Sequence, residues 1–354
     1  MSRFLNKKYS GLTAYTPGEQ PRDLQYIKLN TNESPYPPGA GVSAAITAPE
    51  IGDLRLYSDP TCTALRERFA DLYKVDLPNV FVANGSDDIL NFAFMAFGGD
   101  GVVFADITYG FYPVYAALHG IDAVEIPLKE DFSIDPTGFV NAGRMVVIAN
   151  PNAPTGIAMP LGEIEGIVKS NPKHVVLIDE AYVDFGGSSA LSLTKKYDNL
   201  LVVGTFSKSR SLAGARLGFA VASEAIIEDL ERLKYSTNPY NVNRLTQTIG
   251  IAALGENGYY MDNCKKIIET REYTAAALGE LGFRVLPSSA NFIFAESGRI
   301  GGAEFYRQLK ARGILVRHFD SPKICNFNRI TIGTKEQMEK FVNTTREILC
   351  EPQK

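Results

Sequence analysis

The side chains best placed to do chemistry lie around Lys208. This lysine follows Ser207 in a run of small hydroxyl residues, and Arg216 comes eight positions later. An amine forms a Schiff base only when it is unprotonated, and a phosphate bound beside it needs hydroxyl donors and a bidentate cation. The pattern is therefore typical of a lysine that holds a phosphorylated aldehyde cofactor. The alternative is a solvated lysine in a polar turn, which is the common case at protein surfaces.

An acidic residue at the end of an apolar run supports the first interpretation. Asp179 follows Val-Val-Leu-Ile at 175–178, where a carboxylate is costly to bury unless a cation or a donor meets it. A protonated ring nitrogen is a suitable cation, and a ring that stays charged in this way can act as an electron sink. Tyr182, three residues later, can donate a hydrogen bond to the same ring. A helix cap at Asp179 and a packing tyrosine at Tyr182 are the alternatives.

Two further turns could complete such a site. Asn84-Gly85-Ser86-Asp87 stands between a predicted strand and a predicted helix, so free backbone N–H groups at the helix start could bind a phosphate. Tyr109 follows another predicted strand and is placed to stack on a planar ring. An ordinary turn and a core tyrosine are the alternatives when each motif is taken alone.

The elements that must position these side chains follow an alternating pattern. Helical spacing of apolar residues predicts helices at 63–73 and 88–96, and short apolar runs predict strands at 79–83, 101–105, 123–126, 145–149, 175–178, 200–203 and 218–221. Strands that alternate with helices predict an α/β fold with a mostly parallel sheet between helices. Lys208 and Asp179 then both follow strands, at the carboxyl edge where α/β sheets bind ligands.

The rest of the chain predicts an arm and a second, smaller domain. Residues 1–45 are rich in proline, glycine and polar groups, which predicts an extended arm that packs with the small domain. A single core stops growing at roughly 250–300 residues, so a chain of 354 residues is expected to have two domains. Residues 46–250 form the predicted large domain. Residues 251–354 form a predicted small α+β domain, with a long helix at 258–281, short strands at 284–286, 291–294, 314–316 and 330–332, and a terminal helix.

Composition argues against several classes of partner. The formal net charge is −4 and no basic run occurs, so nucleic acid and anionic membranes have no electrostatic support. No apolar segment approaches the roughly 18 residues needed to cross a bilayer, and the first residues lack the apolar core of a signal peptide. The four cysteines and three histidines are widely separated, which argues against a metal site. We therefore expect a cytoplasmic protein that acts on small molecules.

Three motifs taken together resemble a known family. They are Asn-Pro-Asn-Ala-Pro-Thr-Gly at 150–156, Asp-Glu-Ala-Tyr at 179–182, and Ser-Lys at 207–208 with an arginine eight residues after the lysine. This combination resembles the pyridoxal-phosphate aminotransferases of fold type I, and the resemblance covers nearly the whole chain. Segments 15–21, 28–38 and 56–60 are similar to the histidinol-phosphate aminotransferases within that superfamily.

The resemblance implies a cofactor, a reaction and a set of residue roles. The cofactor is pyridoxal 5′-phosphate, and the reaction is a ping-pong transamination between L-glutamate/2-oxoglutarate and L-histidinol phosphate/imidazole-acetol phosphate, in histidine biosynthesis. Lys208 is the implied Schiff-base lysine and general acid/base, and Tyr57 reaches the cofactor phosphate of the neighbouring subunit, which requires a homodimer with shared sites. The other implied cofactor contacts are Asp179, Tyr182, Tyr109, Asn152, Ser207, Arg216, Gly85 and Ser86, and the implied substrate contacts are Arg329, Arg317 and Asn32.

The chain departs from the family pattern at one position, and several alternative functions stay open. Many relatives carry asparagine before Pro-Thr-Gly, where this chain has Ala153, so Asn152 and Tyr182 are the candidates to replace the missing hydrogen bond to the cofactor's 3′ oxygen. The same cofactor also serves threonine-phosphate decarboxylases and aromatic amino acid aminotransferases. A non-catalytic pyridoxal-phosphate regulator needs a DNA-binding segment, for which the arm is too short. A nicotinamide-dependent dehydrogenase needs a Gly-x-Gly-x-x-Gly turn that we do not find.

Overall fold

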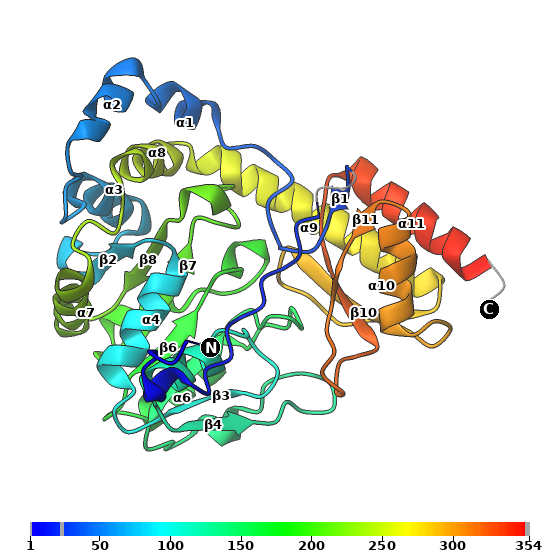
Figure 1. The fold of residues 1–354 in the computed structure, drawn as a ribbon, viewed down its shortest axis with the longest axis horizontal. Helices are drawn as coiled ribbons and strands as arrows, with labels where there is room; N and C mark the ends of the chain where they lie inside the picture. Colours follow the sequence, from blue (N-terminus) through cyan, green and yellow to red (C-terminus); the bar gives the residue numbers. More distant parts are fainter. Residues whose placement is uncertain (1, 22–24, 351–354) are drawn as a thin grey trace.

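The computed structural model describes residues 2–21 and 25–350 of the 354-residue chain. The predicted arm (1–45) and small domain (251–354) therefore include positions 1, 22–24 and 351–354, which lie outside the described residues. Two main sheets organise the chain, a larger one on the left of Figure 1 and a smaller one on the right. The long helix α9 (Asn257–Glu280) runs between these two halves.

The larger sheet has seven strands in a mostly parallel arrangement. Its strand pairs are parallel except for the two made by β8, which runs antiparallel to both of its neighbours. The predicted α/β fold with a mostly parallel sheet is therefore confirmed. In spatial order the strands are β2 (Val80–Ala83), β8 (Gly218–Val221), β7 (Leu200–Thr205), β6 (Val176–Asp179), β5 (Met145–Ala149), β3 (Val102–Ala105) and β4 (Ala123–Ile126).

Helices cover both faces of this sheet because its strands alternate their side chains between two cores. On β5, Val147 packs in one core with α4, α5 and α7, whereas its neighbours Val146 and Ile148 pack in the opposite core with α6. A third core joins α3 and α8 to β2 and β8. The helices around the sheet are α3 (Thr63–Tyr73), α4 (Ser86–Phe97), α5 (Tyr112–His119), α6 (Leu161–Ser170), α7 (Glu224–Thr237) and α8 (Arg244–Gly255).

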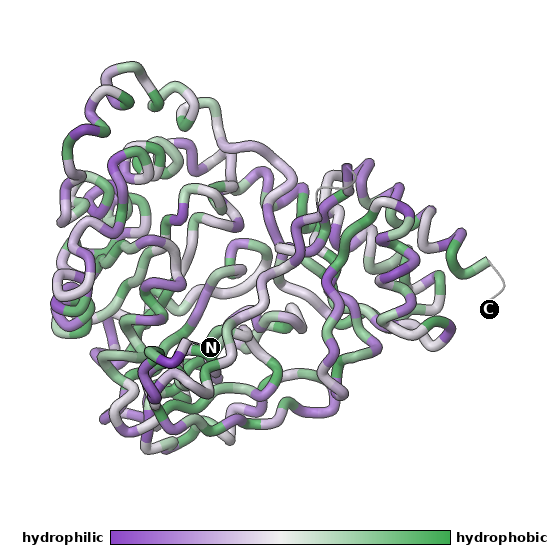
Figure 2. Tube along the Cα trace, viewed as in Figure 1, coloured by the Kyte–Doolittle hydropathy of each residue, from purple (hydrophilic) through white to green (hydrophobic). Residues whose placement is uncertain are grey.

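The smaller sheet is antiparallel and packs against three helices in one core. Its helices are amphipathic: Phe305 and Leu309 of α10 enter the core, and the helical parts of the chain alternate between hydrophobic and hydrophilic residues (Figure 2). In spatial order its strands are β12 (Arg317–His318), β13 (Phe327–Thr331), β10 (Phe292–Ser297) and β9 (Phe283–Val285), and its helices are α9, α10 (Gly302–Ala311) and α11 (Lys335–Cys350).

The N-terminal segment connects the two halves (Figure 1). Tyr15 stacks on Phe111 of the large half, with ring centres 4.1 Å apart, and β1 (Ile27–Lys28) then pairs with β11 (Ile314–Leu315) of the small half. The segment is not extended throughout, because small residues form the short helix α1 (Ala40–Ala45), followed by α2 (Ala48–Gly52). Short 3₁₀ helices lie at Lys7–Tyr9, Asp53–Arg55, Leu77–Asn79, Pro136–Phe139, Val183–Phe185, Ala190–Lys195 and Ala213–Ala215.

None of the helices within residues 2–21 and 25–350 combines the length and the apolar character that a membrane crossing requires.

Candidate active site

The register of the large sheet brings predicted site residues to one edge. Asp179, the last residue of β6, stands beside Ala149 on β5 and Val203 on β7. The chain leaves β7 at Thr205 and reaches Lys208 three residues later. A cavity of about 370 Å³ lies at this edge, and of the predicted site residues it is lined by Lys208, Asp179, Tyr182, Tyr109, Ser207, Arg216 and Ser86.

Asp179 presents a buried carboxyl group to the cavity. Only 5% of the residue is exposed, its Oδ2 accepts a hydrogen bond from Tyr112 Oη at 2.9 Å, and its Oδ1 accepts one from the Ala181 N–H at 3.2 Å. Burial raises the pKa of this carboxyl to about 6 from the ordinary 3.8, because the charged form loses its water. A cation bound in the cavity would lower the cost of ionisation, so the site is suited to a positively charged ring nitrogen.

Lys208 presents its amine to the same cavity. Its Nζ donates to the Thr31 carbonyl at 3.2 Å and lies 5.8 Å from the centre of the Tyr182 ring. No carboxylate of the described residues forms an ion pair with this amine. The contact with Thr31 shows that the N-terminal segment forms part of the cavity wall, together with Gln20 and Glu33.

Hydroxyl, guanidinium and backbone groups gather at one end of the cavity. Arg216 Nη2 pairs with Asp87 Oδ2 at 2.9 Å, and its Nη1 lies 3.5 Å from Ser207 Oγ. The helix α4 begins at Ser86, and its N-cap residue, Gly85, has no side chain to cap the N–H groups of the first turn. These donors can bind a phosphate at the positive end of the helix dipole.

Tyr109 is fixed at the same end by Asp87. Its Oη donates to Asp87 Oδ1 at 2.8 Å, and burial, followed by this carboxylate, raises the pKa of the phenol well above its ordinary value. Since Asp87 also pairs with Arg216, one carboxylate positions both the aromatic ring and the guanidinium. The sequence had not indicated this role for Asp87.

Two glycines let the start of α4 lie close to β8, next to the groups that can bind a phosphate. Gly85, just before α4, has a φ of +86°, which few residues other than glycine adopt. A methyl group at Gly218 of β8 would overlap the backbone of Gly85 and Ser86. The start of α4 therefore lies where it does because β8 has no side chain at this position.

Replacing Gly218 by alanine should displace the Gly85–Ser86 turn. We expect the variant to lose about 1–3 kcal/mol of unfolding free energy, because backbone atoms must move, and to bind pyridoxal 5′-phosphate more weakly. Thermal denaturation and titration of the cofactor-free protein measure the two effects. The control is Gly166→Ala in α6, where a Cβ meets open space and should stabilise the helix by about 0.5–1 kcal/mol. Normal cofactor affinity of Gly218→Ala would show that this close approach is dispensable.

Arg329 does not appear among the residues that line the cavity. Its Nη2 donates to the Asn30 carbonyl at 2.9 Å, and its guanidinium lies 5.4 Å from the centre of the Phe292 ring. Its Nε is buried without a hydrogen-bond partner among the described residues, and burial lowers the pKa of the guanidinium. A partly buried cation with an unused, buried donor is suited to bind an anionic group.

The structure places Arg317 and Asn32 in contacts with the protein itself. Arg317 Nη2 lies 3.4 Å from the Thr16 carbonyl of the N-terminal segment. Asn32 is buried, and its Nδ2 donates to Tyr182 Oη at 3.0 Å while its Oδ1 accepts from Thr331 Oγ1 at 2.9 Å. Neither residue lines the cavity, so Asn32 here links Tyr182 to the smaller sheet.

Asn152 and Tyr57 also lie outside the cavity lining. The Asn152 Nδ2 donates to the Ile107 carbonyl at 2.9 Å, and its Oδ1 accepts from Thr108 Oγ1 at 2.9 Å. Its amide is therefore engaged elsewhere, which leaves Tyr182 as the candidate that lines the cavity beside Ala153. Tyr57 is 78% exposed and its ring stacks on Tyr240 with centres 4.4 Å apart.

The cavity thus offers an amine, a buried carboxyl, an aromatic ring and a set of anion-binding donors. This combination fits a planar aldehyde that carries a basic ring nitrogen and a phosphate. Within the described part of the chain, no three His, Cys, Asp or Glu side chains are arranged to hold a metal ion.

Comparisons with known proteins agree with this chemistry. The family model for aminotransferase class I and II matches residues 25–344. The chain is 51% identical over 352 residues to the histidinol-phosphate aminotransferase of Brachyspira hyodysenteriae, which covers 99% of both proteins.

Solved structures with the same fold include two different activities. The histidinol-phosphate aminotransferase of Sinorhizobium meliloti, in complex with pyridoxal-5′-phosphate, has a TM-score of 0.83 at 23% identity and covers 92% of this chain and 91% of its own. The L-threonine-O-3-phosphate decarboxylase of Porphyromonas gingivalis has a TM-score of 0.79 at 21% identity, with coverages of 92% and 100%. At these identities the two structures establish the fold alone. The family model and the sequence relative together show that this chain belongs to the aminotransferase class I and II family, among the histidinol-phosphate aminotransferases.

Proposed function

We propose that this protein is a pyridoxal-phosphate-dependent transaminase of histidine biosynthesis. It moves an amino group between the L-glutamate/2-oxoglutarate pair and the L-histidinol phosphate/imidazole-acetol phosphate pair. The observation that carries the proposal is the shared cavity, which is lined both by Lys208, just beyond β7, and by the buried Asp179 at the end of the adjacent strand β6. The relative at 51% identity supports the choice of substrates.

The cavity residues divide the task of holding the cofactor. When bound, pyridoxal phosphate supplies an aldehyde that takes up amines and a ring that withdraws electrons from the substrate's α-carbon. Asp179 would keep the ring nitrogen protonated, since an ionised carboxylate in this buried position stabilises a neighbouring cation. The remaining proposed contacts are Tyr109 against the ring, Tyr182 at its 3′ oxygen, and Ser207, Arg216, Gly85 and Ser86 at the phosphate.

Lys208 has two tasks in this proposal. Its Nζ would hold the cofactor aldehyde, and the same amine, when free, would accept the proton lost from the substrate's α-carbon. The neutral Thr31 carbonyl orients the amine without fixing its charge as a carboxylate would. Both tasks require the amine to stay inside the cavity, where its side chain lies.

The wider organisation is part of the same proposal. We propose a cytoplasmic homodimer in which Tyr57 reaches the partner's cofactor phosphate, and the high exposure of its ring is consistent with such a role. We also propose that the chain divides into an arm (1–45), a large cofactor-binding domain (46–250) and a small domain (251–354). The pairing of β1 with β11 supports contact between the arm and the small domain.

Replacing Arg329 by lysine should weaken the binding of glutamate. A lysine keeps the charge but loses the planar fork that matches a carboxylate, so we expect the KM for glutamate to rise about 10- to 100-fold with a smaller change in kcat. Steady-state kinetics measure both constants. Arg284→Lys on β9, where the arginine is half exposed and pairs with Glu296, is the matched control and should leave both unchanged. An unchanged KM in Arg329→Lys would remove Arg329 from the substrate site.

One assay tests the proposed reaction against its alternatives. Purified protein with pyridoxal phosphate, glutamate and imidazole-acetol phosphate should form 2-oxoglutarate and histidinol phosphate in equal amounts. Activity restricted to phenylpyruvate-type acceptors would favour an aromatic aminotransferase. Release of carbon dioxide from threonine phosphate without a keto acid would favour a decarboxylase, whose fold this chain shares.

A further inference from the structure

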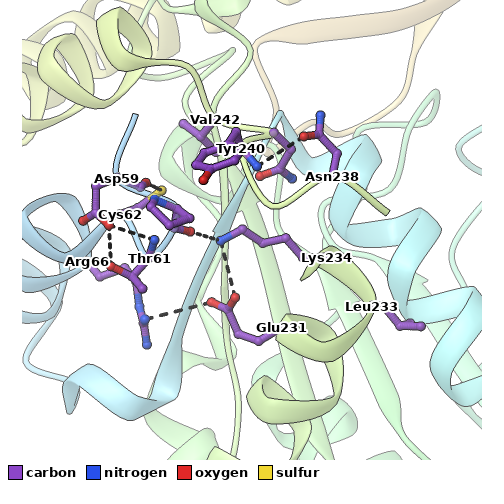
Figure 3. Close-up of polar contacts among 12 residues, drawn as sticks. Asp59, Thr61, Cys62, Arg66, Glu231, Leu233, Lys234, Asn238, Tyr240 and Val242 are labelled. Carbon is purple, nitrogen blue, oxygen red and sulfur yellow. Dashed lines mark hydrogen bonds and ion pairs between the residues drawn. The ribbon is translucent and has the colours of Figure 1, made fainter. Parts of the chain in front are cut away.

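Lys234, on α7, is a buried cation away from the cavity. Its side chain is 0% exposed, its Nζ donates to the Pro60 carbonyl at 2.8 Å, and Glu231 Oε2 lies 3.4 Å from it. Figure 3 shows the lysine reaching from α7 toward the turn that contains Asp59 and Cys62. An ammonium group is costly to bury unless such partners replace its water, whereas a methionine could fill similar space without this cost. At this position a lysine adds the contact with the Pro60 carbonyl and the ion pair with Glu231.

Pro60, whose carbonyl accepts this bond, is the last residue of the segment 57–60, which we call the Tyr57 segment. Side-chain hydrogen bonds hold each of its residues against the start of α8 or against α7. They are Arg244 Nη2 to the Tyr57 carbonyl (3.0 Å), Ser58 Oγ to the Val242 carbonyl (2.8 Å), Gln247 Nε2 to the Asp59 carbonyl (2.8 Å) and Lys234 Nζ to the Pro60 carbonyl (2.8 Å). The bonds from Arg244 and Gln247 are exposed to solvent, whereas those from Ser58 and Lys234 are partly buried. Water competes less for these two bonds, and of the two only the bond from Lys234 has a charged donor, so this bond holds the segment most firmly.

Lys234 also belongs to a wider connection between elements. Glu231 lies between Lys234 and Arg66, with its Oε1 3.9 Å from Arg66 Nη1 on α3 (Figure 3). Arg66 in turn donates from Nη2 to the Leu77 carbonyl at 3.1 Å. The lysine therefore holds the Tyr57 segment to a frame made by α7 and α3.

The Tyr57 side chain depends on that frame. Its ring is 78% exposed and stacks on the Tyr240 ring, which follows α7 and is itself 40% exposed. Apart from this stacking the ring is exposed, so the position of its phenol follows the backbone of the Tyr57 segment and that of Tyr240.

We infer that Lys234 is a positioning residue that sets where Tyr57 is presented. The inference rests on the proposed function, in which Tyr57 reaches the cofactor phosphate of the partner subunit. Lys234 does not contact the cofactor itself; it holds the Pro60 carbonyl, and the held backbone carries the phenol three residues earlier.

The test compares Lys234→Met, Tyr57→Phe and the double variant with the wild type. The Kd of pyridoxal phosphate is measured by visible absorbance on adding the cofactor to the cofactor-free protein. Each single variant should raise this Kd about tenfold, the worth of one hydrogen bond to a charged group. The double variant should bind no more weakly than the single ones, because both changes remove the same contact. Lys265→Met, on the exposed face of α9, is the control and should leave the Kd unchanged.

Hydrogen exchange of residues 57–62 gives a readout that does not depend on the cofactor. Exchange should be faster in Lys234→Met than in the wild type, and unchanged in Tyr57→Phe and Lys265→Met. Lys234→Gln retains a donor for the Pro60 carbonyl and should give intermediate values, and it replaces the methionine variant if that variant does not fold. Unchanged exchange in the Lys234 variants, or a Kd in the double variant that multiplies the two single losses, would overturn the inference. Faster exchange with a normal Kd in Tyr57→Phe would support the hold of Lys234 on the segment and reject the proposed role of Tyr57.

Discussion

Replacing Lys208 by alanine should abolish transamination, with kcat falling by at least about 10⁴-fold. Lys208 is the one lysine in the described residues that lines the cavity, so no neighbouring amine can take over its covalent and proton-transfer tasks. The variant should still fold, because the substitution removes a single hydrogen bond, from Nζ to the Thr31 carbonyl. Steady-state assays with glutamate and imidazole-acetol phosphate measure the loss, and circular dichroism checks the fold.

Lys265→Ala is the matched control for this experiment. Its side chain is 71% exposed on α9, away from the cavity lining, and its loss should leave kcat unchanged. Borohydride reduction of the wild type, followed by mass spectrometry, should place the pyridoxyl group on residue 208. Near-normal turnover by Lys208→Ala, or a label on another lysine, would contradict the assignment.

Elements with a local signature were predictable from the sequence. The helix at 63–73 and the strands at 123–126, 145–149 and 218–221 have the predicted bounds, because the spacing of apolar residues is encoded within a few residues. The same applies to the placement of Asp179 at the end of one buried strand and of Lys208 shortly after another. Because the carboxyl ends of parallel strands lie at one edge of a sheet, this placement predicted that both side chains lie at that edge, where the cavity is found.

Pairings between distant residues were not predictable in this way. Arg216 meets Asp87 from 129 positions away, and Lys208 meets the Thr31 carbonyl from 177 positions away. Such contacts depend on the strand order and on the antiparallel direction of β8, which periodicity does not report. Tyr112 could have been suspected, since a tyrosine that starts a helix after a strand needs a partner for its hydroxyl when buried.

The start of α4 shows how a local rule can also mislead. The sequence predicted a helix from residue 88, whereas α4 begins at Ser86. Acidic residues are favourable in a first turn because they face the positive end of the helix dipole, so Asp87 and Asp88 belong inside the helix and not before it. The earlier start is what leaves Gly85 at the turn beside Arg216.

Replacing Asp179 by asparagine should lower kcat/KM by about 10²- to 10⁴-fold. Asparagine keeps the shape but lacks the charge that stabilises a ring cation, and removing one member of a buried ion pair costs about 3–5 kcal/mol. Tyr112→Phe is the graded comparison, because it removes only the hydrogen bond to Asp179 Oδ2 at 2.9 Å and should cost about tenfold. Equal activity of Asp179→Asn and the wild type would show that the carboxylate has no electrostatic task.

The same substitution should change how the stability of the cofactor-free protein depends on pH. The pKa of Asp179 is about 6 in the folded protein against 3.8 in an ordinary setting, so the folded state holds a proton that the unfolded state has lost. The stabilising contribution is complete below pH 3.8 and is lost as the pH rises through about 6, which amounts to about 3 kcal/mol. Asparagine does not titrate, so the unfolding free energy of Asp179→Asn should rise relative to that of the wild type as the pH increases from 4 to 7.

Urea titrations at several pH values measure this difference in unfolding free energy. Bound cofactor should reduce the difference, since the ring cation favours the ionised carboxylate. A difference that stays constant with pH would mean that Asp179 has the same pKa in the folded and unfolded states, and would contradict the cost of ionisation from which the need for a cation is argued.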